Sequence, residues 1–229
     1  MRSGLFITAL AAPVALAASP AMAATPGGDT MSGFYVGGHV GYARGSTDWA
    51  GPPNPLPAPG FTESNTADLD PNGFIGGLTA GGRWQSGYVV LGVEGQASFG
   101  SLEDSAASTS VAGVTNTTEI DWMGSVTAQF GIQTGKVHAY LEVGVGFTGS
   151  EYSIADTNGV APNTSGSVSD TRSGVVFGGG FEYLLDSHWS VRGEYNYLTV
   201  GSNDYVIGGQ TWAINQTTQT FTLGVNYRF

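Results

Sequence analysis

The sequence contains no cysteine and few charged residues, and each of these absences excludes a class of protein. Without cysteine there is no disulfide, no thiolate metal site and no cysteine nucleophile, although the redox compartment stays undetermined. Charged residues make up 11% of the chain, against roughly 25% in soluble domains, so a surface that faces water throughout is hard to build. An ordinary soluble globule is therefore not expected.

Basic residues are scarcer still. The chain has 7 Lys and Arg residues against 18 Asp and Glu, which gives a formal net charge of −11. Binding to phosphate backbones requires a basic surface, so nucleic acid is excluded as the main partner. The 37 glycines follow no collagen period, and the 11% of aromatic residues argues against disorder. A length of 229 residues fits a single domain.

Only the N-terminus contains a long apolar run. Arg2 precedes a largely apolar stretch over residues 5–18, which is followed by Ala21-Met22-Ala23, the small-x-small pattern that a signal peptidase accepts. We expect residues 1–23 to be a cleaved signal peptide and residues 24–32 to be an N-terminal periplasmic segment. The cleavage pattern disfavours the alternative, an uncleaved membrane anchor.

The rest of the chain alternates between apolar and polar residues with period two, as in β-strands that have one apolar face. The clearest segment is the last one, where Phe221, Leu223 and Val225 alternate with Thr222 and Gly224. Eight such segments follow one another, and their apolar positions begin at Phe34, Phe74, Val89, Ile120, Val137, Val175, Trp189 and Phe221.

Short and long connections alternate between these segments. Tight turns are expected at 85–87, 132–136 and 185–188, and long polar loops at 45–72, 100–118, 151–172 and 201–216. An even number of strands of about ten residues, with short turns on one side and long loops on the other, is typical of outer-membrane barrels. A sheet can span hydrocarbon only when it is closed, because every backbone donor and acceptor must be paired internally. Residues 33–229 are therefore predicted to be an all-β, eight-stranded antiparallel transmembrane β-barrel with short periplasmic turns and four long extracellular loops.

Aromatic residues concentrate at the ends of the predicted strands, where a bilayer meets water. The turn-side residues are Phe34, Trp84, Tyr88, Phe130, Tyr183, Trp189 and Phe229, and the loop-side residues are Tyr42, Phe74, Phe99, Trp122, Phe147 and Phe221. The alternative is a soluble eight-stranded ligand barrel, whose outer face would be charged. Here the polar face contains mainly Gly, Ser, Thr, Asn and Gln, which suits a narrow lumen better.

Glycine- and aromatic-rich blocks recur on the strands: Gly33-Phe34-Tyr35-Val36-Gly37-Gly38, Gly73-Phe74-Ile75-Gly76-Gly77, Val90-Leu91-Gly92-Val93-Glu94-Gly95, Trp189-Ser190-Val191 and Val225-Asn226-Tyr227-Arg228-Phe229. Together they resemble the small outer-membrane immunogenic protein family of Gram-negative bacteria, within the OmpA-like class of eight-stranded barrels. The resemblance implies a porin-like protein or surface antigen, and haem binding in some members. The terminal Tyr227 and Phe229 also resemble the signal read by the barrel-assembly machinery, which implies that machinery as a transient partner.

Ionisable residues of both signs fall on the inward face of the predicted strands: Arg83, Arg192, Arg228, Glu94, Asp121, Glu142, Glu182, Glu194, His39 and His138. The interior of an eight-stranded barrel is only just wide enough for side chains, so these groups should pair across the lumen. The interpretation we favour is a hydrogen-bonded plug that holds the barrel's shape. The alternative is a polar passage or gate for small ions, which would prefer cations because the acids outnumber the arginines.

No catalytic constellation stands out, and no metal or cofactor is expected. Barrel enzymes place His near the outer face, but no His lies in the four long loops. Asp186, Ser187 and His188 have a triad-like composition, yet adjacent residues in a tight turn cannot easily arrange a base and a nucleophile. Acidic residues of the loops are interpreted as a solvated surface, or alternatively as a divalent-cation site shared with anionic lipid: Asp48, Glu63, Asp68, Asp70, Glu103, Asp104, Glu151, Asp156, Asp170 and Asp204.

These observations predict a non-enzymatic, monomeric outer-membrane barrel surrounded by outer-membrane lipid and lipopolysaccharide. Its expected role is structural and that of a surface antigen, with at most narrow porin-like permeability. The alternative is a surface receptor or adhesin that binds host or environmental ligands, haem included, through its loops. Haem ligation needs exposed His, Tyr or Met, and of these types the long loops contain only Tyr152 and Tyr205.

Overall fold

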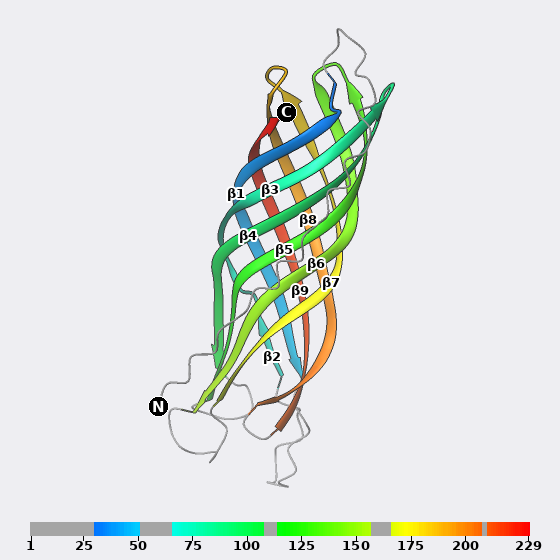
Figure 1. Cartoon of the computed structure of the whole chain (residues 1–229). Coiled ribbons are helices and arrows are strands. Elements are labelled where there is room, and N and C mark those ends of the chain that lie inside the picture. Colours follow the sequence, from blue (N-terminus) through cyan, green and yellow to red (C-terminus); the bar gives the residue numbers. More distant parts are fainter. Residues whose placement is uncertain (1–29, 51–65, 108–113, 157–165, 208–209) are drawn as a thin grey trace, which may run out of the picture.

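A closed ring of antiparallel strands forms the protein. The structure, a computed structural model, describes residues 30–50, 66–107, 114–156, 166–207 and 210–229. Its strands are β1 (Gly33–Ala50), β2 (Thr66–Leu69), β3 (Asn72–Ser86), β4 (Val89–Ala107), β5 (Val114–Thr134), β6 (Val137–Asp156), β7 (Gly166–Leu184), β8 (Trp189–Ile207) and β9 (Gln210–Arg228). The short β2 pairs with the end of β1, and the other eight strands form a ring that pairing of β1 with β9 closes (Figure 1). This confirms the predicted eight-stranded antiparallel barrel.

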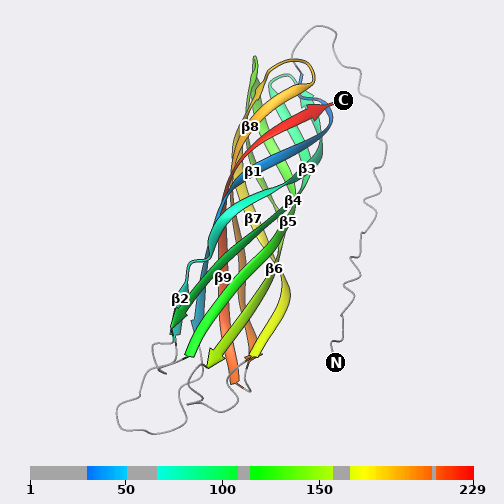
Figure 2. The same ribbon diagram turned by 90° about the vertical axis from the view of Figure 1, so that its left-hand side faces the viewer.

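The two ends of the barrel differ, as the sequence predicts. Short turns after β3, β5 and β7 lie at the same end as the C-terminus, which we call the short-turn end (Figure 1). Gly87 and Gly135 have φ angles of 61° and 58°, a left-handed conformation that a side chain disfavours, and each allows a two-residue turn. At the opposite loop end the strands lead into the long connections, and the strands tilt around the barrel axis (Figure 2). None of the described residues forms a helix that is long and apolar enough to cross a membrane.

The strands continue much further toward the loop end than the sequence indicates. β5 has 21 residues and β6 has 20, whereas about 9–11 residues suffice to span a bilayer. Most of the predicted loops 100–118, 151–172 and 201–216 therefore belong to strands, and their predicted bounds were wrong. Ser, Thr and Gly favour loops by composition, but here they take part in ladders whose pairing the neighbouring strands supply. We call these strand segments beyond the loop-side aromatic residues the extension.

Register shifts mark the boundary between the barrel wall and the extension. They occur in β4 between Phe99 and Leu102, in β5 between Ile120 and Trp122, and in β8 between Thr199 and Ser202. An extra residue in a strand reverses the faces of all residues beyond it. Ile120 is therefore fully buried inside the barrel while Asp121 is exposed, so the predicted inward position of Asp121 was wrong.

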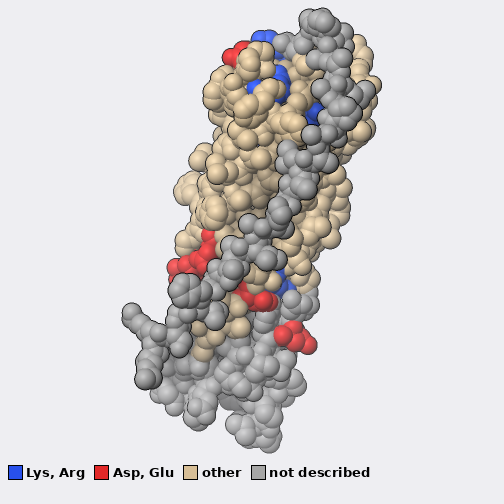
Figure 3. All heavy atoms as spheres, in the orientation of Figure 1, with Lys and Arg blue, Asp and Glu red and all other residues tan. Residues whose placement is uncertain are grey.

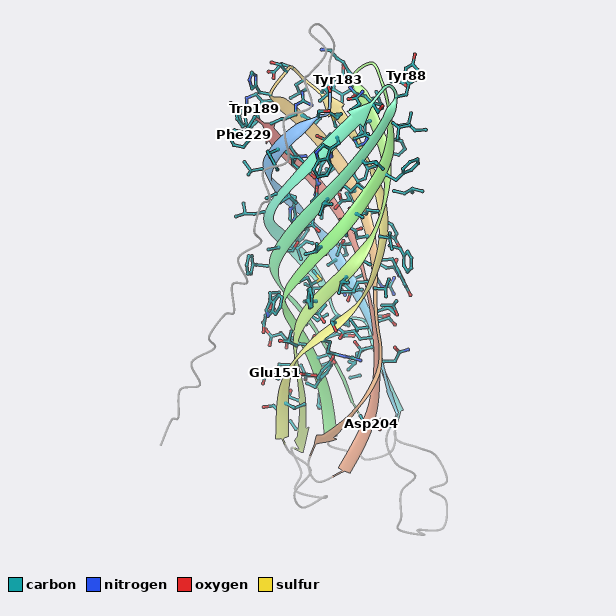
Figure 4. All side chains as sticks on the ribbon, turned by 45° about the vertical axis from the view of Figure 1, so that its right-hand side comes forward. Tyr88, Glu151, Tyr183, Trp189, Asp204 and Phe229 are labelled. Atoms are coloured by element: carbon teal, nitrogen blue, oxygen red, sulfur yellow. The ribbon has the colours of Figure 1, made fainter. Side chains whose placement is uncertain are left out.

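The outer wall is apolar between two bands of aromatic residues. All thirteen aromatic residues predicted for the strand ends are exposed. Figure 4 labels Tyr88, Tyr183, Trp189 and Phe229 near the short-turn end, and Glu151 and Asp204 near the loop end. No charged side chain is visible in the middle of the barrel on the part of the wall that Figure 3 leaves uncovered. This is the outer surface that a bilayer requires, because a charge facing lipid costs several kcal/mol at the midplane.

Glycines on the inner wall make room for aromatic rings on the neighbouring strand. Gly81 lies opposite Tyr35 in the ladder, and a Cβ at Gly81 would come within 2.5–2.8 Å of the Tyr35 ring. Gly180 lies opposite Tyr140, and a Cβ there would come within 2.8 Å of the phenol oxygen. Each ring therefore occupies space that a side chain at the facing position would fill, which accounts for part of the high glycine content.

The turn between β7 and β8 is held by a side chain. One carboxylate oxygen of Asp186 accepts hydrogen bonds from the backbone N–H groups of His188 (2.7 Å) and Trp189 (2.8 Å). These two bonds favour the ionised form and so lower the pKa of Asp186 below its usual range.

The Asp186 bonds predict a pH dependence of this turn. Because the folded pKa is lowered, the carboxylate stabilises the turn above the ordinary pKa of 3.8, and this contribution is lost as the pH falls through the folded value. The measurement is an NMR titration of the His188 and Trp189 amides in detergent micelles, with Asp186→Asn as the control that keeps the acceptor but does not titrate. An Asp186 midpoint at the ordinary value would contradict the assignment.

Candidate functional site

A network of buried charges crosses the lumen. The Arg83 guanidinium of β3 lies 2.7 Å from a carboxylate oxygen of Glu182 in β7 and 4.0 Å from Glu94 in β4. In β8, the Arg192 guanidinium lies 2.5 Å from Glu94 and 3.4 Å from Glu194. All five side chains are at most 3% exposed. Glu94 therefore joins the two arginines, and the network ties together strands on opposite sides of the ring.

Neutral side chains satisfy the remaining carboxylate oxygens. The Tyr35 hydroxyl donates a hydrogen bond to Glu94, and the Tyr140 hydroxyl donates one to Glu194 over 2.6 Å. Four further carboxylate contacts are Ser190 to Glu182 (2.5 Å), Asn226 to Glu182 (3.3 Å), Asn196 to Glu194 (2.9 Å) and Gln96 to Glu194 (3.3 Å). Arg83 also lies over the Tyr35 ring, 4.3 Å from its centroid. Buried charges are stable only when they are paired and hydrogen-bonded in this way.

Glu142 extends the network without an arginine of its own. One of its carboxylate oxygens accepts hydrogen bonds from Thr127 (2.9 Å) and from the Gln129 amide (3.1 Å). Ligand oxygens of Glu94, Glu142 and Glu194 lie within 4.8 Å of one another, so among the described residues they are the group that could hold a metal ion. Arg192 already lies against two of these three carboxylates, which reduces their net charge and their need for a cation.

Apolar layers lie on both sides of the charged network. Toward the short-turn end, Met31, Val90 and Leu184 form one buried cluster. Toward the loop end, the buried residues form two clusters on opposite walls: Ala43, Ile75, Leu102, Ile120 and Met123, and Val176, Leu198 and Val200. A cavity of about 40 Å³ beside Met123 and Leu198 has room for only a few water molecules.

A second polar layer fills the lumen within the extension. Arg172 is 2% exposed and donates hydrogen bonds to the Tyr152 hydroxyl (3.3 Å), to the Val200 carbonyl (3.2 Å) and to the Gly201 carbonyl. The Tyr152 hydroxyl in turn donates to Gln216 over 2.8 Å. The composition of residues 151–172 predicted that Arg172 and Tyr152 lie in an outer loop, and this prediction was wrong. Tyr152 is fully buried, so it is not an exposed haem ligand.

Three residues of the predicted network lie apart from it. Arg228 is half-buried at the short-turn end, where it donates to the Ser187 carbonyl over 2.8 Å and contacts the Met31 sulfur at 3.4 Å. His39 is buried beside Ser98, with 2.8 Å between Nε2 and Oγ. Asp121 lies outside, for the reason given above.

Two tyrosines, Tyr35 and Tyr140, belong to the network but were not among its predicted residues. Tyr35 alternates with the outward Phe34 and Val36, so its inward direction follows from period two, and Tyr140 has the same parity as Glu142. Both tyrosines lie opposite a glycine in the ladder. An inward Tyr paired with Gly is therefore the signal that could have found them.

The triad-like residues of the turn between β7 and β8 and the acidic residues of the predicted loops are the remaining predicted features. Ser187 Oγ lies 2.9 Å from His188 Nδ1, but the Asp186 carboxylate binds backbone amides, so a triad geometry is not formed. His188 instead stacks on Tyr227, with 5.7 Å between centroids. Of the predicted loop acids whose side chains are described, Asp70 lies between β2 and β3, and the others lie on strands: Glu103 and Asp104 on β4, Glu151 on β6, Asp170 on β7 and Asp204 on β8. Glu63 and the side chains of Asp48, Asp68 and Asp156 lie outside the described residues.

The sequence also matches a known family. The family model described as outer membrane protein beta-barrel domain matches residues 9–229. The chain belongs to this family. It is accordingly a β-barrel protein of the cell outer membrane, which confirms the predicted localisation.

Relatives of this barrel protein support the resemblance to immunogenic proteins. The 31 kDa outer-membrane immunogenic protein of Brucella melitensis is 29% identical, over 99% of this chain and 96% of the relative. The 25 kDa outer-membrane immunogenic protein of the same organism is 28% identical, over 72% of this chain and 70% of the relative. Among solved structures, the outer membrane protein OprG from Pseudomonas aeruginosa matches with a TM-score of 0.56 and 15% identity, over 86% of this chain and 96% of that one. This last likeness concerns the fold alone.

Proposed function

We propose that the protein is a non-enzymatic structural barrel of the outer membrane whose lumen is closed and whose extension is a surface antigen. The observation that carries this proposal is the buried network in which Glu94 lies against both Arg83 and Arg192. An ion that followed the lumen would have to break these pairs and then pass the apolar residues around Met123. Moving an ion through a narrow apolar constriction is costly, so a plug is favoured over a pore.

The surroundings follow from the outer surface. Lipid would cover the apolar wall, and lipopolysaccharide would meet the barrel near the loop-side aromatic residues. The barrel-assembly machinery would read the C-terminal residues, where Tyr227 packs edge-on against Trp189 and Phe229 with centroids 5.0 and 5.2 Å apart. Phe229 is exposed, as a residue that another protein reads must be.

Conductance measurements test the closed lumen. Purified barrel in a planar bilayer is expected to give no steady current above the baseline, while a general porin in the same bilayer gives current. The physical reason is the series of charged and apolar layers described above. A steady current that prefers cations would contradict the plug and favour the alternative of a narrow pore with a negative lumen.

The second candidate function is a surface receptor. The observation in its favour is the extension, because an ordered rim beyond the aromatic residues is more than spanning requires. For haem, the test is a titration of the intact barrel with haemin, followed by the Soret band. A saturable shift that disappears in Tyr205→Phe would support haem binding, and the absence of any saturable shift would exclude that ligand.

A further inference from the structure

The segment immediately before β1 folds over the mouth of the lumen. It consists of Thr30, Met31 and Ser32, and it lies at the short-turn end, where β1 begins beside the C-terminus (Figure 1). We call these three residues the strap. The Met31 side chain is only 1% exposed and packs against Val90 of β4 and Leu184 of β7. A thioether therefore fills the space between strands that do not neighbour one another in the ring.

One glutamine holds all three residues of the strap. Gln85 Oε1 accepts hydrogen bonds from the Met31 backbone N–H (2.7 Å) and from the Thr30 hydroxyl (3.1 Å). The backbone N–H of Gln85 donates to the Ser32 hydroxyl over 2.9 Å. Gln85 itself is fixed, because its side-chain amide donates to the Gly87 carbonyl over 2.9 Å. The hydrogen bonds between the strap and β3 thus all meet at a single residue, and Arg228 of β9 makes a further contact with the Met31 sulfur at 3.4 Å.

The charged network begins just inside this mouth. His138 is 1% exposed, lies opposite Glu182 in the ladder and stacks on Tyr140 with 5.1 Å between centroids. The access of water to residue 138 therefore shows whether the mouth is closed. Leu184 lies two residues beyond Glu182 toward the short-turn end, so the cluster of Met31, Val90 and Leu184 is on the mouth side of His138.

We propose that the strap seals the periplasmic end of the lumen. In this seal the Met31 side chain closes the mouth, and hydrogen bonds to Gln85 hold the strap in place. The seal deepens the proposed function, because it adds a closure at the mouth to the network in the middle. It is a releasable closure: three hydrogen bonds to Gln85, the packing of the Met31 side chain and its contact with Arg228 hold it, whereas the charged side chains of the network come from β3, β4, β6, β7 and β8. Withdrawing the strap exposes His138 and Glu182 to the periplasm without breaking a strand pair.

Single-cysteine labelling tests the seal, because the natural chain contains no cysteine. In the His138→Cys variant, reaction with a small water-soluble methanethiosulfonate is expected to be slow. Adding Met31→Gly or Gln85→Ala should accelerate labelling by about tenfold or more, because each change shifts the local opening equilibrium. The matched control is Gln219→Ala, which removes an exposed glutamine that accepts a hydrogen bond from Tyr195 on the outer wall. This control should leave the rate unchanged.

Two outcomes would overturn the seal. One is an unchanged labelling rate in both strap variants, and the other is a parent rate as fast as that of Ser187→Cys in the exposed turn. Folding of each variant is checked by its heat-dependent shift on gels. Ser190→Cys is a second labelling probe, because Ser190 is 4% exposed and cysteine is close in shape to serine. Labelling requires no ion current, so failure of the seal is distinguishable from failure of the plug, which would appear as current in the unmodified barrel.

Discussion

Replacing Arg192 by alanine is expected to lower the free energy of unfolding by about 3–5 kcal/mol. The side chain is buried and lies against both Glu94 and Glu194, so its removal leaves two buried carboxylates without this cation. Arg83 is 4.0 Å from Glu94 and already bonded to Glu182, and it cannot compensate for both losses. The measurement is urea-induced unfolding of the barrel in lipid vesicles, followed by tryptophan fluorescence.

Two further variants separate the network from a general effect of losing an arginine. Arg44→Ala breaks the exposed Arg44–Asp70 pair and should cost only about 0–1 kcal/mol. Combining Arg192→Ala with Glu194→Ala removes one of the two carboxylates that lose this cation. The double change should therefore lower the free energy of unfolding by less than the sum of the single changes. Additive losses, or a loss from Arg192→Ala no larger than that from Arg44→Ala, would contradict a coupled buried network.

Much of the fold and of the candidate site can be predicted from period two alone. Alternation determines which side chains face inward, so Arg83, Glu94 and Arg192 could be assigned to the lumen without a structure. Alternation does not determine which inward residues meet. That depends on the stagger of the strands around the closed ring, and it is why Glu142 meets Thr127 and Gln129 while Glu182 meets Arg83.

The failures have equally local causes. One extra residue in β5 reverses the face of Asp121, and nothing in the surrounding composition marks a bulge. Arg172 follows a Ser- and Gly-rich stretch that is typical of loops, yet it lies on a strand and its guanidinium binds two carbonyls at the β8 register shift. Sequence patterns therefore predict the wall that faces lipid better than they predict the extension. Selection for alternation is strict in the wall, whereas in the extension the outward side chains face water and can be polar or apolar.

Replacing Gly81 by valine is the second change with a large expected effect. A Cβ at this position would come within 2.5–2.8 Å of the Tyr35 ring, so the ring must move and its hydrogen bond to Glu94 must break. Overpacking together with a lost bond to a charged group should cost about 2–5 kcal/mol. Urea unfolding in vesicles measures this loss, and Gly95→Val on the outer wall is the control, because the nearest atom to its added Cβ is 3.9 Å away.

A compensating change distinguishes a clash with the ring from a loss of backbone freedom at Gly81. Tyr35→Ala removes the ring, so in that background Gly81→Val should cost clearly less than it does alone. If the clash is the cause, the two changes are coupled through Glu94, since each deprives that carboxylate of the same hydroxyl. If Gly81→Val lowers the free energy of unfolding as much in the Tyr35→Ala background as it does alone, a clash with the ring is not the cause. Gly81 would then be required for the backbone conformation, and the pairing of inward rings with glycines would have no explanation.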